Sequence, residues 1–301
     1  MKILNFGSLN IDHVYAVDEF VRPGQTIAAR SCRTFPGGKG LNQSIALARA
    51  GAKCFHAGRI GADGLFLRQL LESDGVDCRH LAVDDANPSG HAMIQVSRTG
   101  ENCIVLFGGT NRLITSEQAE QAMADFGEGD ILLLQNEISA MPQIMRIAAG
   151  RGMRIFLNPA PMNDDARALP LELVDTLIVN ESEGAGLAEL ADGGNAGEVL
   201  DALHRKYPHA NLLLTLGAGG SCRMDAASGQ IDAVPACRVE RVVDTTAAGD
   251  TFIGYYLADI AAGCTPLEAM QTATRASAIC VGRAGASVSI PKRSEVQPMT
   301  H

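Results

Sequence analysis

The chain has 301 residues, of which 46% are hydrophobic and 4% aromatic, so it can bury a large core built mainly from aliphatic side chains. Its net charge of -9 argues against a nucleic-acid partner, which would need a basic face. The sequence has no apolar stretch of the roughly 18 residues that span a membrane, and its first apolar run is too short for a signal peptide, so we expect a cytoplasmic protein without a membrane partner.

The first predicted elements are a strand over residues 2–6 and two segments of different character. Residues 11–35 and 90–107 contain short runs with β-branched residues, separated by turns, and residues 98–101 carry a hairpin signal. They do not fit an alternating layer of strands and helices, so we predict that they form a small projecting β-sheet. Helices at 41–50 and 65–73, and a strand at 53–60, are predicted between them.

After Phe107 strands and helices alternate regularly. We predict strands over 131–134, 154–157, 176–179 and 212–215, and helices over 115–126, 140–149 and 200–207 with another from Glu181. Residues 115–118 form a capping-box pattern. The alternation predicts one α/β domain over 1–301, with a mainly parallel central sheet and helices on both faces. Ligands of such sheets bind at the carboxyl ends of the strands.

The strongest chemical signal lies in residues 243–252, Val-Asp-Thr-Thr-Ala-Ala-Gly-Asp-Thr-Phe. Val242 and Val243 predict a strand that leads through small residues into an apolar helix over 252–262. The first turn of a helix presents free N–H groups and a positive dipole end, which suit a phosphoryl group. Asp250 could accept a proton there. An isolated motif of this kind would more often be a helix cap.

A second motif, Pro-Gly-Gly-Lys-Gly-Leu-Asn-Gln, occupies residues 36–43 before a helix. It lacks the spacing of a Walker phosphate loop, and no Ser or Thr follows Lys39. The glycines would permit close approach of a ligand such as a sugar, to which Lys39 and Asn42 could donate hydrogen bonds. Alone, this motif would indicate only a loop.

The two motifs, about 200 residues apart in this order, resemble the paired signatures of the ribokinase-like (PfkB-type) carbohydrate kinase family. The likeness covers nearly the whole chain, although Ala247 replaces the glycine that is commoner in the family. It implies an ATP-dependent kinase for the primary hydroxyl of a pentose, with D-ribose as the first choice. Deoxyribose, another sugar or a nucleoside are the alternatives, and a kinase for a sugar phosphate is less favoured because no basic cluster is evident.

The resemblance also implies roles for individual residues. Asp250 would be the base, next to the catalytic turn formed by Ala247, Ala248 and Gly249. With Asp250, the sugar would be held by Asn10, Asp12, Gly38, Lys39, Asn42 and Glu137. Without the family, Asp12 would be read as a turn residue and Glu137 as the N-terminal acid of a helix.

The same resemblance implies the sites for the nucleotide and the metals. ATP would contact Asn180, Thr215, Gly217 and Gly220, where Ala218 and Gly219 depart from the expected pattern. Glu183 would help to position Mg²⁺, largely through water; without the family, this segment is a solvated helix start. A monovalent cation, K⁺, would be held by Asp244, Thr246, Cys280, Arg283, Gly285 and Ser289, a segment that otherwise indicates a glycine-rich loop.

The family further implies that the projecting sheet acts as a lid and pairs two subunits into a homodimer. Two other classes remain to be weighed. A catalytically silent sugar or nucleotide sensor would lack the base, yet Asp250 is present. A dinucleotide dehydrogenase would need G-x-G-x-x-G after the first strand, and residues 7–12 lack it.

Overall fold

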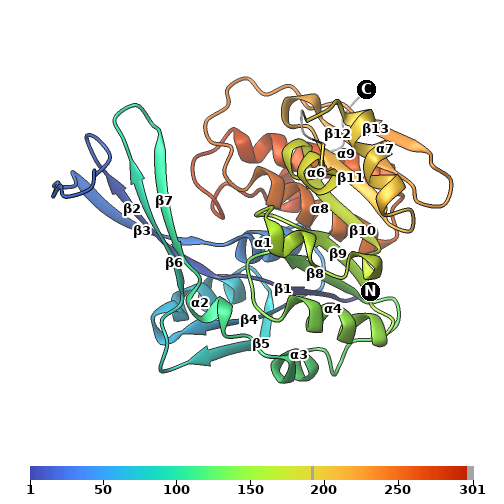
Figure 1. Cartoon of the computed structure of the whole chain (residues 1–301), viewed down its shortest axis with the longest axis horizontal. Coiled ribbons are helices and arrows are strands. Elements are labelled where there is room, and N and C mark those ends of the chain that lie inside the picture. Colours follow the sequence, from blue (N-terminus) through green and yellow to red (C-terminus); the bar gives the residue numbers. More distant parts are fainter. Residues whose placement is uncertain (191–192, 297–301) are drawn as a thin grey trace.

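The computed structural model describes residues 1–190 and 193–296, so the end of the predicted domain, residues 297–301, lies outside the described part. Its larger sheet has nine strands, with helices on both sides (Figure 1). Only the pairs β11–β12 and β12–β13 are antiparallel. In spatial order the strands are β13 (Ile231–Val234), β12 (Ser221–Met224), β11 (Asn211–Thr215), β10 (Thr176–Asn180), β9 (Arg154–Asn158), β8 (Ile131–Gln135), β1 (Ile3–Phe6), β4 (Cys54–Gly61) and β5 (Asp77–Asp84).

Successive residues of each buried strand point to opposite faces of the sheet, and each face has its own core. Leu133 belongs to one core and its neighbours Leu132 and Leu134 to the other. The helices of the first core are α1 (Lys39–Arg49), α2 (Leu65–Ser73), α8 (Ala248–Ala262) and α9 (Pro266–Val281). Those of the second are α3 (Ser116–Ala122), α4 (Met141–Gly150), α6 (Glu181–Ala188) and α7 (Ala196–Lys206). A short helix, α5 (Asp164–Arg167), lies between β9 and β10 in the chain.

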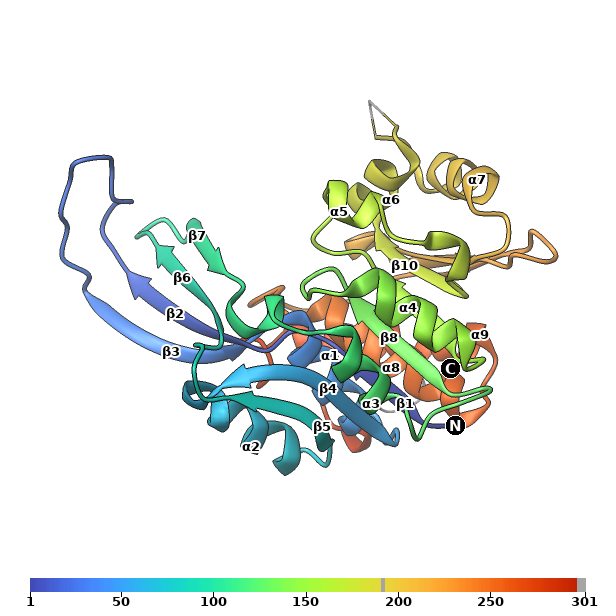
Figure 2. The ribbon, with the colours of Figure 1, turned by 60° about the horizontal axis from the view of Figure 1, so that its bottom comes forward.

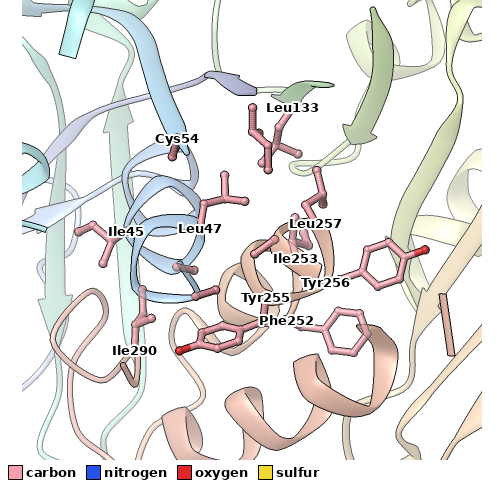
Figure 3. Close-up of a cluster of buried hydrophobic side chains, with 14 of the residues drawn as sticks. Ile45, Leu47, Cys54, Leu133, Phe252, Ile253, Tyr255, Tyr256, Leu257 and Ile290 are labelled. Atoms are coloured by element: carbon pink, nitrogen blue, oxygen red, sulfur yellow. The ribbon is translucent and has the colours of Figure 1, made fainter. Parts of the chain in front are cut away.

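Helices α1 and α8 meet in the first core. Figure 3 shows Ile45 and Leu47 of α1 in the same core as Phe252, Ile253 and Tyr255 of α8. Gly254 permits this contact, because a Cβ built there would lie 2.3 Å from Cβ of Ala46. The two helices can therefore approach closely enough to bring their amino-terminal turns together.

A second sheet of four strands projects from the main body (Figures 1 and 2). The strands are β3 (Ser31–Gly37), β2 (Asn10–Ala16), β6 (Gly90–Val96) and β7 (Asn102–Phe107), in that order across the sheet. Strands β6 and β7 form a hairpin closed by the hydrogen bond from Ser97 N to Glu101 O, 3.0 Å. The predicted fold class, a helix-covered parallel sheet with a small projecting sheet, is confirmed.

Three local predictions differ from the structure. Val242 and Val243 belong to no strand; their side chains are 60% and 49% exposed, and the segment is attached by a bond from Val243 N to Val281 O, 2.8 Å. Helix α3 ends at Ala122 rather than near 126. Its capping box is only half formed, because the Gln118 amide donates to Gly58 O, 2.7 Å, instead of returning to Thr115.

Five strands and α-helices were missing from the sequence prediction: β5, α5, β12, β13 and α9. The amino-terminal signal of α9 was present in the sequence. Thr265 and Glu268 form a complete capping box around Pro266 in the first turn of the helix. Within the described residues, no helix combines the length and the apolar character that crossing a membrane requires.

Candidate active site

The two sequence motifs meet where α1 and α8 begin. Asn42 Nδ2 donates to Oδ2 of Asp250 over 3.0 Å, and Gln43 Nε2 donates to Oδ1 over 2.8 Å. Both amides come from the first turns of α1, and Asp250 lies in the first turn of α8. The structure therefore brings the proposed base directly against the glycine-rich motif.

Glycines give the first motif its shape. Gly38 has φ 97°, and a Cβ there would lie 2.9 Å from Ser8 O. A Cβ on Gly40 would lie 2.4 Å from Ser8 N. The turn therefore packs backbone to backbone against the end of β1, as Leu41 N donating to Ser8 O, 3.0 Å, also shows.

Glu137 links this turn to the end of β8. Its carboxylate accepts hydrogen bonds from Lys39 N, 3.1 Å, and from the hydroxyl of Ser8, and it lies 3.7 Å from Lys39 Nζ. The alternative reading of Glu137 as the N-terminal acid of a helix is wrong, because Glu137 precedes α4 and contacts the glycine turn instead. Lys39 and Glu137 thus form a charged pair beside Asp250.

Asn10 and Asp12 approach the same place from β2. Asn10 Oδ1 accepts from the buried Asn111 Nδ2, 2.8 Å, which leaves the Asn10 amide hydrogens for another partner. The carboxylate of Asp12 lies against Gly37, where a Cβ would be 2.2 Å from Oδ2. Burial, and after it the charge of Glu137, raises the pKa of Asp12 to about 6.

The pKa values of Asp250 and Lys39 depend on each other's charge. Burial raises the pKa of Asp250, and Lys39, Gln43 and Asn42 oppose that rise. Burial would lower the pKa of Lys39, but the carboxylates of Glu137, Asp250 and Glu183 outweigh it and the pKa is raised. Lys39 is therefore held as a cation among three acids.

The amino-terminal turn of α8 provides main-chain donors. The N–H of Ala248 donates to Thr245 O, 3.2 Å, whereas those of Ala247, Gly249 and Asp250 have no acceptor among the described residues. Ala247 is in the left-handed region with φ 61°. A cradle for an anion can therefore be built from Gly249 and Asp250 rather than from Ala248.

Two adjoining hollows open on this turn. The smaller, about 210 Å³, is lined by Lys39, Asn180, Glu183, Gly249 and Asp250 among others. Asn180 and Glu183 form a complete capping box at the start of α6, so the helix-start reading of this segment is realised in the structure. Burial raises the pKa of Glu183, against the Asn180 N–H and the Lys39 charge. Only Oε2 of Glu183 is engaged in these bonds, so Oε1 is available to a water or a metal ion.

The larger hollow, about 490 Å³, runs from the start of α8 along α9. Thr215, Gly217 and Gly220 line it, together with Val242, Phe252 and Val281. Thr274 of α9 also lines it, and its buried hydroxyl has no hydrogen-bond partner in the described part of the chain. Mainly apolar walls with a few polar groups suit a planar base with attached phosphates. The prediction missed Thr274 because it missed α9, whereas Gln43 was visible in the glycine motif and was given no role.

The residues proposed for a monovalent cation lie together at the carboxyl end of α9. Asp244 accepts from Thr246 N, 2.9 Å, and from Gly285 N, 3.0 Å. The Cys280 thiol lies 3.1 Å from the Ser289 hydroxyl and 3.7 Å from Thr246 O. The guanidinium of Arg283 points to Glu295 at 2.6 Å, so only the main chain of Arg283 could contribute. In the part of the chain that the structure describes, no three His, Cys, Asp or Glu side chains converge as metal ligands.

Comparisons with known proteins identify relatives of the chain. The model of the pfkB family carbohydrate kinases matches residues 1–293. The chain is 35% identical to the ribokinase of Haemophilus influenzae over 96% of this chain and 95% of that protein. It is also similar to solved structures of a Cryptococcus neoformans ribokinase in complex with ADP (34% identity, TM-score 0.83, 98% of each chain) and of the Arabidopsis thaliana ribokinase complexed with ribose and ATP (27% identity, TM-score 0.88, 98% of this chain and 97% of that one).

Proposed function

Because the chain belongs to the pfkB family of carbohydrate kinases and is an ATP-dependent phosphotransferase with an alcohol group as acceptor, we propose that it converts D-ribose to ribose 5-phosphate. The observation that carries this proposal is the contact of Asp250 with Asn42, beside Lys39 and Glu137. This cluster combines a base with several groups that bind hydroxyls. The name of the H. influenzae relative and the ribose in the A. thaliana structure favour ribose.

The sugar would occupy the space between the glycine turn and β2. Asn10, Asp12, Lys39, Asn42 and Glu137 would bind its ring hydroxyls, and Gly38 would allow it to approach the main chain. Fixed donors and acceptors of this kind orient the reacting hydroxyl before the chemical step. Asp250 would then stand at the primary hydroxyl.

In the chemical step, the oxygen of that hydroxyl attacks the γ-phosphorus of ATP while its proton passes to Asp250. The bond from phosphorus to the β-phosphate oxygen breaks, and ADP leaves. The free N–H groups of Gly249 and Asp250 would stabilise the phosphoryl oxygens as charge redistributes. Lys39, held as a cation, adds to this stabilisation.

The nucleotide would lie in the larger hollow, with its base near Thr274 and its phosphates directed toward Gly249. Asn180 and Glu183 fit a role beside a hydrated magnesium ion, since one carboxylate oxygen of Glu183 is uncommitted. When bound, Mg²⁺ would neutralise phosphate charge. Thr215, Gly217 and Gly220 border the same space and would contact ATP.

A potassium ion is proposed at the loop that follows α9. The supporting observation is that Asp244, Thr246, Cys280, Gly285 and Ser289 are already joined by hydrogen bonds and thiol contacts. Their carbonyl, carboxylate and hydroxyl oxygens are the hard donors that K⁺ accepts. Because Asp244 immediately precedes the α8 turn, the ion would order the main-chain donors of that turn.

The projecting sheet is proposed as a lid that excludes water and as the contact between two subunits of a homodimer. All six residues of β7 are exposed, including Ile104, Val105, Leu106 and Phe107. An edge strand with exposed apolar side chains on both faces is a typical contact surface. Its root, Asn10 and Asp12 on β2, belongs to the proposed sugar site.

We also propose a cytoplasmic location for the protein. Cys32 and Cys103 are free and exposed on the projecting sheet, and such thiols persist where the compartment is reducing. The ATP that the reaction consumes is likewise a cytoplasmic substrate.

A coupled assay of ADP release tests the substrate proposal. The purified chain is offered ribose, deoxyribose, other pentoses, hexoses and nucleosides in turn, with ATP and Mg²⁺. We expect the highest kcat/KM with ribose. A preference for a nucleoside or for deoxyribose would replace ribose as the substrate, and binding without ADP release from any of them would instead favour the non-catalytic sensor.

A further inference from the structure

Behind Asp250 a continuous chain of buried amides runs into the sheet. Gln43 Nε2 donates to Asp250 Oδ1 over 2.8 Å, and Gln43 Oε1 accepts from Gln135 Nε2 over 2.7 Å. Gln135 Nε2 also donates to Asn5 Oδ1 over 3.0 Å. Gln43, Gln135 and Asn5 are each 0% exposed, so no bulk water can substitute for these bonds. These residues come from α1, β8 and β1, the elements at the centre of the fold.

The direction of every bond in this chain is fixed by one main-chain carbonyl. Asn5 Nδ2 donates to Gly40 O over 2.8 Å, and a carbonyl can only accept. The oxygen of Asn5 must therefore face Gln135, which must present its NH₂ group. That group in turn requires the oxygen of Gln43, so the NH₂ of Gln43 must face Asp250. The carboxylate is thus offered a donor and never an acceptor.

The other end of the network carries no charge. Asn5 Nδ2 also donates to the Ser44 hydroxyl over 2.8 Å, and Ser44 Oγ lies 2.8 Å from His56 Nδ1. Burial lowers the pKa of His56 to about 4, so its ring is neutral at physiological pH. The charged groups that act on Asp250 are Lys39, which favours its ionised form, and Glu137, which opposes it.

We propose that Gln43 is a positioning residue for the transfer reaction, which holds the carboxylate of Asp250 ionised and in a single orientation, and that Gln135 acts through it. Oδ1 accepts from Gln43, whereas among the residues that the structure describes Oδ2 accepts only from Asn42, a proposed sugar ligand. The chain of amides from Asn5 through Gln135 and Gln43 (the amide relay) therefore directs Oδ2 toward the sugar as the oxygen that takes the proton. This inference rests on the proposed function, since it assigns a role within that reaction.

The test compares Gln43→Met with Gln118→Met. Both replacements remove a glutamine whose Nε2 donates one hydrogen bond, but Gln118 donates to Gly58 O, away from Asp250. We expect Gln43→Met to lower kcat about tenfold or more at neutral pH, because hydrogen bonds to charged groups are the stronger ones. KM for ribose should change little. Gln118→Met should leave kcat unchanged.

The pH dependence of kcat separates positioning from a general loss of structure. Loss of the Gln43 donor raises the pKa of Asp250, so the acidic limb of the profile should move to higher pH by about one unit. Gln135→Met should shift the limb in the same direction, and the double variant should be no worse than Gln43→Met alone. A profile that coincides with wild type, or additive losses in the double variant, would overturn the proposal.

Gln43→Glu serves if the methionine variant does not fold. It keeps the shape of the side chain and an oxygen for Gln135, but it places a second carboxyl group against Asp250. The acidic limb should again move upward, and an unmoved limb would contradict the inference. If the wild-type chain shows no ribose-dependent ADP release, the proposed function itself fails. If the wild-type chain is active and the variants have the same kcat and pH profile, only the role proposed for the amide relay fails.

Discussion

Asn42 and Asp250 are 208 positions apart in the chain, yet the amide of one and the carboxylate of the other are 3.0 Å apart. The contact joins the first turns of two helices that pack on the same face of the large sheet. In the proposed reaction, this contact places the base directly against a residue that binds the sugar. The predictions below test what each part of this arrangement contributes.

Asp250→Asn is expected to keep the fold and the binding of sugar but to lower kcat by about 10²–10⁴, the usual cost of losing a general base. The amide is close to the carboxylate in size, so α8 should be undisturbed. Ribose-dependent ADP formation measures the loss, and the thermal unfolding midpoint checks the fold. A rate near that of wild type would show that Asp250 is not the base.

Asp12→Asn is expected to weaken sugar binding while stabilising the protein above pH 7. The pKa of Asp12 is raised from 3.8 to about 6, so the folded state holds this proton more tightly than the unfolded state does. Its contribution to stability is therefore present at low pH and is lost as the pH rises through about 6. The variant should unfold at a higher temperature than wild type above pH 7, and this difference should vanish as the pH falls to 4. A constant difference at all pH values would argue against the raised pKa.

Ala247→Gly is expected to stabilise the fold by about 0.5–1 kcal/mol, because an alanine in the left-handed region is strained and glycine is not. Ala247 has φ 61°. The neighbouring variant Ala248→Gly is the matched control, since Ala248 lies within α8 and should lose stability when replaced. Chemical denaturation measures both. Equal effects at the two positions would contradict the strain at Ala247.

Potassium is expected to raise kcat above its value in sodium at equal ionic strength. Asp244→Asn should reduce the difference between the two salts, because it removes the charge that holds Thr246 and Gly285 in place. The measurement is the same ADP assay in matched chloride salts. Equal rates in both salts for the wild-type chain would exclude activation at this loop.

The double replacement Ile104→Glu and Val105→Glu is expected to convert a homodimer to monomers, as measured by sedimentation velocity. The two side chains are 53% and 64% exposed and lie on opposite faces of β7. Val83→Glu, at an exposed position of β5 in the other sheet, is the control and should leave the assembly unchanged. A wild-type chain that sediments as a monomer would remove the proposed contact.

Most of the main sheet could be predicted because its central strands are apolar on both faces and are separated by amphipathic helices. Strands β12 and β13, at one end of the sheet, lacked that signature, since Arg223 and Asp232 interrupt them. The strand predicted at Val242 and Val243 was wrong because these residues are β-branched but lie in an exposed loop. Val242 lines the larger hollow. Local propensity does not report whether a neighbouring strand is available.

The two motifs of the candidate site could be predicted, but the hydrogen bonds that connect their side chains could not. Spacing and residue type singled out Asp250 and Lys39. The partners of Asp250 depend on how α1 and α8 are placed over the sheet, which no local pattern encodes. The bond from Gln43 to Asp250 and the unpartnered Thr274 hydroxyl emerge only when distant elements are brought together.

Gly254 carries no functional group and faces Ala46 on the neighbouring helix, a full turn along α8 from the base. Even a methyl group at this position would act as a wedge between the two helices. The position of Asp250 relative to the substrate therefore depends on a contact inside the core. A larger residue at position 254 is expected to inactivate the enzyme although every reactive side chain is unchanged.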